Sequence, residues 1–401
     1  MPKTNRKKKP AKPCRDFPLF AHATGQWAKK IRGRLVYFGV WSEPNAALEK
    51  YLEQKDYLQA GVTPPPPGTR FITLAELCNQ FLTSRKTRVE SGEIRISTWE
   101  DYRRSCEMVI EAFGKLHPAD AIGPTDFTKL RGKITKRFGP VRTTREITQI
   151  RMVFNWGFQQ ELLPAPRFGS DFRKPAKDVL RRHRQKSPPK MFEAEEVRSM
   201  LEIANVHTKA WILLGMNCAF IQRDLSDMPV SAVDLDEGIL DFPRVKTAIE
   251  RRAILWPETI EALHDSMENR YDHVRDEDAE LFFITREGNR LVRDNGRDTR
   301  SDAVHDALER VQKKLGIKQK KRSYGAFRHT FRTVADETRD FPAILRIMGH
   351  ADHTISDHYR ERISDERLAD VGTYVRGWLR RRHNDRNQRR EEGGSRQPPV
   401  A

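Results

Sequence analysis

Apolar residues recur every three or four positions over most of residues 70–180, the spacing of helices that each bury one face. Residues 71–88 and 96–114 show this pattern clearly, and two further helices are expected before Pro164. The apolar positions of the last of them are Ile147, Ile150, Val153, Phe154 and Phe158. The pattern predicts a four-helix bundle with these side chains facing inward.

Residues 17–41 follow a different pattern. Short apolar runs are separated there by Gly25, Gly33 and Gly39, which predicts two or three short strands. Pro44 then begins a predicted helix that ends at Gly61.

Residues 191–379 mix both patterns. Two helices are expected first, and three short strands follow between Ser231 and Pro257, with turns at Gly238 and at residues 247–250. The rest of this region is predicted to be mostly helix.

Segments without an apolar pattern divide the chain. Pro64–Gly68 reads PPPPG, a stiff extended linker, and residues 177–190 are basic and end in prolines. The expected parts are a basic disordered arm (1–16), a sheet-and-helix domain (17–63), a linker (64–69), a helical domain (70–180), a linker (181–190), a third domain (191–379) and a disordered tail (380–401). The fold class is therefore mainly α with small β-sheets in a multidomain chain.

The chain is strongly basic, with a net charge of +18 and a pI near 9.8. Such a charge favours a polyanionic partner, above all nucleic acid, with a cationic membrane-surface protein as the competing interpretation. An apolar signal core and any run of 18 apolar residues are both lacking, which argues against secretion and membrane spanning. The four cysteines are far apart and form no CxxC pair, which argues against a zinc site or disulfide framework and fits a reducing cytoplasm.

The candidate chemistry is concentrated in the segment Ser323–Tyr359. Its polar candidates are Arg328, His329, Arg332, His350 and Tyr359. An amphipathic helix is expected to hold Arg328, and a second helix is expected to begin near Pro342 and end at Gly349.

The order of these residues resembles the signature of the tyrosine recombinases, the phage-integrase family. Arg328-His329-Thr330 is followed by Met348-Gly349-His350, with Met in place of the usual Leu, and Tyr359 comes nine residues after His350. The similarity extends loosely from about Phe71 to Trp378. It implies a small N-terminal α/β arm-binding domain, a helical core-binding (SAM-like) bundle and a mixed α+β catalytic domain.

The resemblance also implies a reaction. Tyr359 would attack a DNA phosphate and form a 3′-phosphotyrosyl bond, while Arg328 and His350 would bind the phosphate oxygens. Lys246, in the turn between two predicted strands, would protonate the leaving 5′ oxygen. Metal ions, ATP and other cofactors are not implied.

The chain departs from the family pattern at two positions. Ile221 stands where the family's first arginine is expected, and Arg223 is the nearest candidate to replace it. Gly325 stands where the family has a histidine, and Tyr324 or His329 could cover that role.

Other basic residues are candidates for contacts with DNA phosphates. They are Lys29, Lys30, Arg32 and Arg34 in the N-terminal sheet and Lys86, Arg88, Arg142 and Arg145 in the bundle, and a merely solvated basic surface is the alternative for both groups. The expected partners are double-stranded DNA, further copies of the chain up to a tetramer on synapsed DNA, and accessory DNA-bending proteins, but no membrane. An apolar stripe in residues 363–379 is expected to join protomers, although packing on its own domain is the alternative. Its members are Leu368, Val371, Val375 and Trp378.

The function that the resemblance implies is that of a site-specific recombinase or integrase of a mobile element in the bacterial cytoplasm or nucleoid. Two alternatives remain open. One is a catalytically degenerate relative that only binds or bends DNA, and the other is a type IB topoisomerase, which shares the chemistry.

Overall fold

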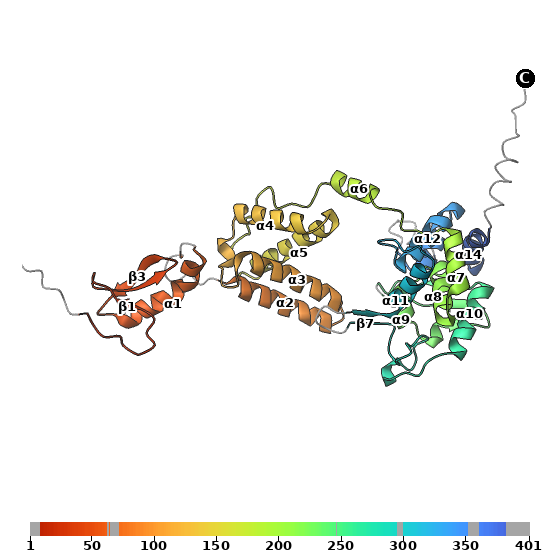
Figure 1. Ribbon diagram of the computed structural model, residues 1–401, viewed down its shortest axis with the longest axis horizontal. Helices are drawn as coiled ribbons and strands as arrows, with labels where there is room; N and C mark the ends of the chain where they lie inside the picture. Colours follow the sequence, from red (N-terminus) through yellow and green to blue (C-terminus); the bar gives the residue numbers. More distant parts are fainter. Residues whose placement is uncertain are drawn as a thin grey trace, which may run out of the picture. The chain divides into compact units, whose positions relative to one another are not determined.

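The computed structural model describes residues 9–61, 64, 72–245, 247–294, 300–351 and 361–381. The chain divides into two compact units between Ser187 and Pro188 (Figure 1). Within the described residues, two hydrophobic cores lie in the first unit and one lies in the second. The predicted fold class, mainly α with small sheets in a multidomain chain, is confirmed.

The first core belongs to a three-stranded antiparallel sheet with one helix. Its elements are β1 (Phe20–Ala21), β2 (Gln26–Ile31), β3 (Arg34–Val40) and α1 (Pro44–Ala60). Trp27 and Phe38 of the sheet are buried in the same core as Tyr51 of α1. Gly61 ends α1 in the left-handed region, at φ +77°, so the strands and the helix predicted here are confirmed.

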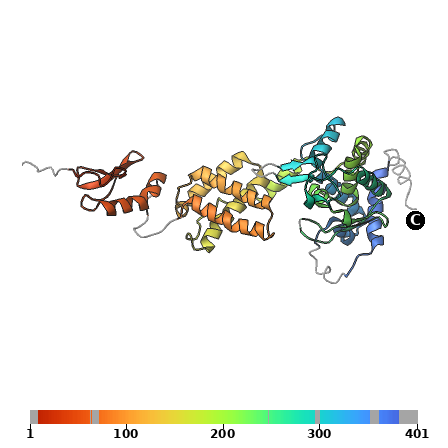
Figure 2. The same ribbon diagram turned by 90° about the horizontal axis from the view of Figure 1, so that it is seen from below.

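The second core belongs to a helical bundle, in which α2 and α3 lie side by side (Figures 1 and 2). The elements are α2 (Leu74–Glu90), α3 (Ile96–Phe113), the 3-10 turn η1 (Ala119–Ala121), α4 (Pro124–Arg137), α5 (Pro140–Gln159) and α6 (Lys177–Gln185). The last of these occupies part of the segment predicted to be a linker.

The prediction that Phe158 faces the core of the bundle is wrong. Phe158 is 48% exposed, whereas the four other apolar positions predicted on α5 are buried. Gly157, one position earlier, faces the core so closely that a Cβ there would lie 2.5 Å from Leu77 Cδ1. Because successive helix positions are turned by about 100°, Phe158 points away from that contact.

The second unit contains two small sheets and eight α-helices among its described residues. The helices are α7 (Ala194–Ile203), α8 (Val206–Asn217), α9 (Gln222–Asp227), α10 (Pro257–Glu268), α11 (Ala303–Lys314), α12 (Gly325–Ala335), α13 (Phe341–Met348) and α14 (Asp365–Arg380). The strands are β4 (Val233–Asp234), β5 (Ile239–Asp241), β6 (Arg252–Ile254), β7 (Val292–Asp294) and β8 (Arg300–Asp302), and the 3-10 turns are η2 (Val230–Ala232), η3 (Asp276–Asp278) and η4 (Asp336–Thr338). The three strands predicted before Pro257 are confirmed as β4–β6, while the β7–β8 pair was not expected.

Helix α8 lies at the centre of this unit and is buried from Ala210 to Asn217. Helices α10 and α12 pack against it. Gly215 permits the close approach of α12, because a Cβ at this position would lie 2.9 Å from Phe327 Cβ. None of the helices in the described part of the chain is both long enough and apolar enough to cross a membrane.

The expectation that the C-terminal apolar stripe joins protomers is wrong. Leu368, Val371 and Val375 of α14 are buried in the core of their own unit. The Trp256 indole N–H donates to the Gly372 carbonyl at 3.0 Å, which fixes the helix in place. The stripe is covered internally because α7, α12, α13 and β6 all pack on α14.

Candidate active site

Arg328 is held in a fixed position near the start of α12. The helix buries Phe327 and Phe331 in the core, as the apolar spacing predicted, and Arg328 itself is only 9% exposed. Its guanidinium donates from Nη1 to the Ala219 carbonyl at 2.8 Å and from Nη2 to the Met348 carbonyl at 2.6 Å. Two carbonyls from separate segments thus fix the fork before any ligand arrives.

His350 lies beside this arginine because α13 ends there. Asp340 caps the start of α13 by accepting from the Ala343 amide at 3.1 Å, and Gly349 ends the helix at φ +60°. The His350 Nε2 atom is 2.6 Å from Arg328 Nη2. An arginine only donates, so this ring nitrogen must be the acceptor and carry no proton.

The charges around the pair are mostly positive. Burial and the nearby Arg328, Arg244 and Arg332 lower the pKa of His350 to about 4, so the ring is neutral at pH 7. Burial and then Arg244 lower the pKa of Arg328 to about 10, which still leaves this arginine charged at pH 7. Two opposing influences on Arg328 are Asp224, which raises its pKa, and Arg251, which lowers it.

Asp224 and Arg251 form a fully buried ion pair next to this site. Their side chains are 1% and 0% exposed, and Arg251 Nη1 donates to Asp224 Oδ2 at 3.0 Å. The same carboxylate oxygen accepts from the Ile221 amide at 2.9 Å, and the Arg251 guanidinium lies over the Phe220 ring at 4.1 Å. This pair therefore joins the start of α9 to the hairpin of β5 and β6.

Arg223, the predicted substitute for the family's first arginine, makes a different contact. Its Nε donates to Asp227 Oδ2 at 2.5 Å, one helical turn further along α9. It is not among the charges that act on Arg328 or His350. The catalytic role of Arg223 therefore stays a prediction that this geometry does not favour.

The neighbours of Arg328 on α12 have other surroundings. Tyr324 is fully buried, and its hydroxyl donates to the Trp211 carbonyl at 2.5 Å. Burial and Asp224 raise its pKa well above the usual value. His329 is exposed, and burial of part of the ring together with Lys190 and Arg328 lowers its pKa. Neither side chain forms a hydrogen bond with Arg328 or His350 among the described residues, so their supporting roles also stay predictions.

Thr330 ties the same helix to the first residues of the unit. Its Oγ1 accepts from the Phe192 amide at 2.8 Å. The ring of Phe192 lies 4.8 Å from that of Phe327 and beneath the Arg322 guanidinium at 4.6 Å. The chain therefore enters the second unit directly on the helix that carries Arg328.

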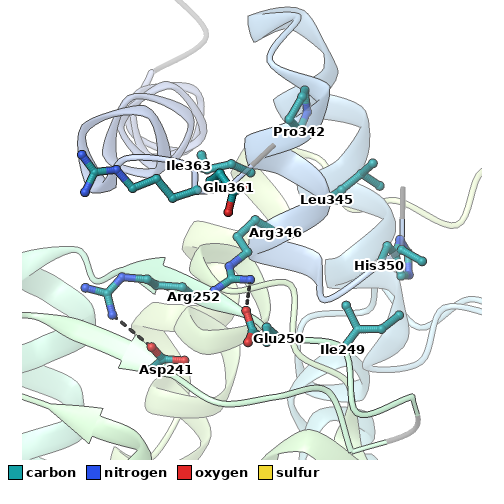
Figure 3. A pocket seen from close by; sticks show the side chains of 12 residues that line it. Asp241, Ile249, Glu250, Arg252, Pro342, Leu345, Arg346, His350, Glu361 and Ile363 are labelled. Carbon is teal, nitrogen blue, oxygen red and sulfur yellow. Dashed lines mark hydrogen bonds and ion pairs between the residues drawn. The ribbon is translucent and has the colours of Figure 1, made fainter. Parts of the chain in front are cut away.

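A pocket of about 600 Å³ opens beside His350 (Figure 3). Arg346 and Glu250 form an ion pair at 2.5 Å on its wall, and Arg252 pairs there with Asp241 at 3.0 Å. Two further predicted site residues, Lys246 and Tyr359, lie outside the described residues.

The residues predicted to contact DNA differ in their exposure and in the partners of their side chains. Lys30, Arg34 and Lys86 are exposed. Arg32 is exposed too but donates from Nη1 to the Gln59 carbonyl at 3.4 Å, and Lys29 donates to the Tyr51 hydroxyl at 2.7 Å. Arg88, Arg142 and Arg145 pair with Glu93, Glu146 and Asp101 respectively. These contacts do not test the role in DNA binding, which stays a prediction.

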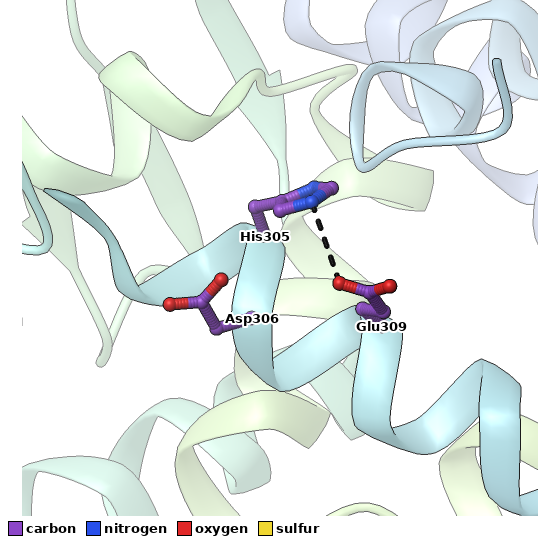
Figure 4. A group of neighbouring side chains, drawn as sticks. All are labelled: His305, Asp306 and Glu309. Carbon is purple, nitrogen blue, oxygen red and sulfur yellow. Dashed lines mark ion pairs between the residues drawn. The ribbon is translucent and has the colours of Figure 1, made fainter. Parts of the chain in front are cut away.

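Among the described residues, one cluster of possible metal ligands lies on α11 (Figure 4). His305 Nε2 is 3.7 Å from Glu309 Oε2, and Asp306 lies beside them. Lys313 and Lys318 also pair with Glu309. The group is explained as a surface network of ion pairs, and we assign no metal to it.

Arg244 and Arg251 were not among the site residues predicted from the sequence. The second had a signal, because Arg251 alternates with Ala253 and Leu255, which are both buried, so the same face of the strand points inward. Arg244 precedes a turn of the hairpin and had no such signal.

Comparisons with known proteins show which family and which solved structures this chain is similar to. Residues 190–365 match the model of the phage integrase family. The structure of a lambda integrase tetramer bound to a Holliday junction is similar with a TM-score of 0.55 at 13% identity, covering 88% of this chain and 98% of that one. The structure of the Tn1549 transposon integrase in complex with transposon right end DNA is similar with a TM-score of 0.55 at 14% identity, covering 75% and 98%.

A search of curated proteins found no match. At these identities the solved structures show a shared fold alone, while the family model covers the part of the chain that holds Arg328 and His350. The domain formed by residues 190–365 is therefore a member of the phage integrase family, the family of the tyrosine recombinases.

Proposed function

We propose that this chain is a site-specific DNA recombinase that cuts and rejoins DNA through a 3′-phosphotyrosyl intermediate on Tyr359. The observation that carries the proposal is the buried Arg328 fork, fixed by two carbonyls and placed 2.6 Å from His350. A preorganised guanidinium of this kind, with a neutral imidazole beside it, stabilises the charge that develops on a phosphate during attack.

The reaction needs no oxidant and no external energy. The Tyr359 oxygen forms a bond to phosphorus as its proton passes to solvent, the bond from phosphorus to the 5′ oxygen breaks, and that oxygen takes a proton from Lys246. A free 5′-hydroxyl reverses the step and rejoins the strand. The basic chain binds double-stranded DNA through its phosphates, and several protomers act together because exchange of two duplexes needs several cuts.

The similar solved structures are consistent with these partners, since they include an integrase dimer and an integrase tetramer on DNA and a transposon integrase in complex with DNA. We accordingly propose the integrase of a mobile element, acting in the bacterial cytoplasm, with DNA-bending proteins as candidate helpers. The second candidate is a degenerate relative that binds DNA without cutting it. Ile221 and Gly325, at the two positions that depart from the family pattern, favour this alternative.

The test is capture of the covalent adduct. The full chain is incubated with a random-sequence pool of nicked duplexes. After cleavage the short fragment with the free 5′-hydroxyl diffuses away, so the strand cannot be rejoined. DNA that stays attached to the protein in SDS is recovered and sequenced. The recombinase should yield adducts with a common sequence, and Tyr359→Phe should yield none while still shifting duplex DNA in a gel.

Tyr374→Phe is the matched control, because Tyr374 is a partly exposed tyrosine on α14 and should leave adduct formation intact. Binding of DNA without any adduct from the unaltered chain would instead support the degenerate relative. Adducts that persist in Tyr359→Phe would show that another residue is the nucleophile.

A further inference from the structure

Under the proposed function, the site has one arginine fewer than its chemistry favours. The attacked phosphate carries charge on two non-bridging oxygens, and loss of one preorganised donor typically costs about 100-fold or more in rate. Ile221 offers no donor on its side chain, and its backbone amide is already bonded to Asp224. Arg223 and Arg251 are held by Asp227 and Asp224 respectively.

Arg244 stands on the hairpin between β5 and β6, at a position that backbone hydrogen bonds define. Its amide donates to the Ile249 carbonyl at 2.8 Å, and its own carbonyl accepts from Ala248 at 2.8 Å and from Thr247 at 3.1 Å. The hairpin therefore presents this side chain from a fixed base, unlike an arginine on a loose surface loop.

The Arg244 side chain runs across the backbone next to His350. A Cβ on Gly349 would lie 2.9 Å from Arg244 Cβ and 3.5 Å from Arg244 Cδ. Gly349 is thus required twice, for its φ of +60° and for this contact. The stem of Arg244 is packed against the residue that links Met348, whose carbonyl binds Arg328, to His350.

The charge of Arg244 acts on both members of the site. It lowers the pKa of Arg328 more than any other charge does, and it also lowers the pKa of His350. Mutual repulsion of this kind is unfavourable in the free protein, and a bound phosphate would relieve it.

We propose that Arg244 contacts the attacked phosphate and supplies the second guanidinium, in the role that Ile221 leaves vacant. Arg328 and Arg244 then approach the non-bridging oxygens from α12 and from the hairpin. Arg244 exchanges no proton, and the bonds formed and broken are those between phosphorus, Tyr359 and the 5′ oxygen. The inference rests on the proposed function.

The test compares Arg244→Gln with the unaltered chain on the nicked duplex identified by adduct capture. Removing the charge while keeping most of the stem should slow adduct formation by at least about 100-fold, with DNA binding changed by less than about threefold, since one lost phosphate contact among many weakens binding little. Arg244→Lys retains a charge but not the fork, so its rate of adduct formation should lie between those of the unaltered chain and Arg244→Gln.

A second substrate separates contact with the phosphate from a structural role. A methylphosphonate at the cut position replaces one charged oxygen with a neutral methyl group, so the deficit of Arg244→Gln should shrink to under about tenfold and differ between the two stereoisomers. A merely structural defect would persist on both substrates. Arg380→Ala, which removes an exposed arginine paired with Glu258, is the control for general loss of positive charge.

The outcomes distinguish the two proposals. If the unaltered chain forms adducts and Arg244→Gln forms them equally fast, or remains equally defective on the methylphosphonate, the role of Arg244 is refuted and the recombinase stands. If the deficit of Arg223→Ala shrinks on the methylphosphonate and that of Arg244→Gln does not, the second guanidinium is that of Arg223. If the unaltered chain forms no adduct with any duplex, both proposals fail.

Discussion

Replacement of Arg251 by Met should destabilise the second unit strongly. The substitution would leave the Asp224 carboxylate 1% exposed, with the Ile221 amide as its remaining donor among the described contacts. Breaking a buried ion pair by removing one partner typically costs about 3–5 kcal/mol, because the other charge stays in a medium that solvates it poorly. That is a large part of the roughly 5–15 kcal/mol that holds a typical domain folded.

Hydrogen exchange in increasing urea, followed by mass spectrometry of the full chain, measures this loss separately for peptides of residues 188–381. Arg252→Met is the matched control, because this adjacent arginine is 27% exposed and pairs with Asp241 and Asp365, which are 55% and 46% exposed. Screened pairs of this kind contribute at most about 1 kcal/mol. Equal losses for the two variants would refute the reasoning from burial.

Three further outcomes are expected. Gly215→Ala should lower the unfolding temperature, because the added Cβ would lie 2.9 Å from Phe327 Cβ and overpacking costs about 1–3 kcal/mol. This cost should exceed the gain of about 1 kcal/mol in helix propensity. An unchanged unfolding temperature would show that α12 can move away freely. The folded pKa of His350, about 4, is below its ordinary 6.5, so the unfolded chain binds more protons between these values and stability falls as pH drops through them. His350→Gln should therefore lose less stability than the unaltered chain between pH 7 and pH 4 in urea titrations, and parallel curves would contradict this. Truncation after Ile363 removes α14 from the core and should abolish protection from hydrogen exchange throughout the second unit; a truncated chain with native protection would make that helix dispensable.

Periodicity in the sequence predicted most elements of this fold because burial of one face repeats at the period of the element. It worked for α2–α5 and for the strands before Pro257, where apolar side chains dominate. It failed for β7 and β8, whose residues VRD and RSD hold too few apolar positions to show an alternation.

The pattern also could not say what covers an apolar stripe. The stripe on α14 is the same whether a second protomer or the chain's own β6 lies against it, and only the folded unit decides between them. The position of Arg328 was predictable from its motif, but the carbonyls of Ala219 and Met348 that hold it come from distant segments. Backbone acceptors carry no sequence signal, since every residue has one.

The attachment of Phe192 to Thr330 has a mechanical consequence. Residues 188–191 are all that separates the boundary between the units from the hydrogen bond that anchors the chain on α12. A force on the connecting segment would therefore act on the helix turn next to Arg328. The Phe192 ring also packs against the Phe327 ring in this turn. The position of the Arg328 fork is therefore tied to the point at which the chain enters the second unit.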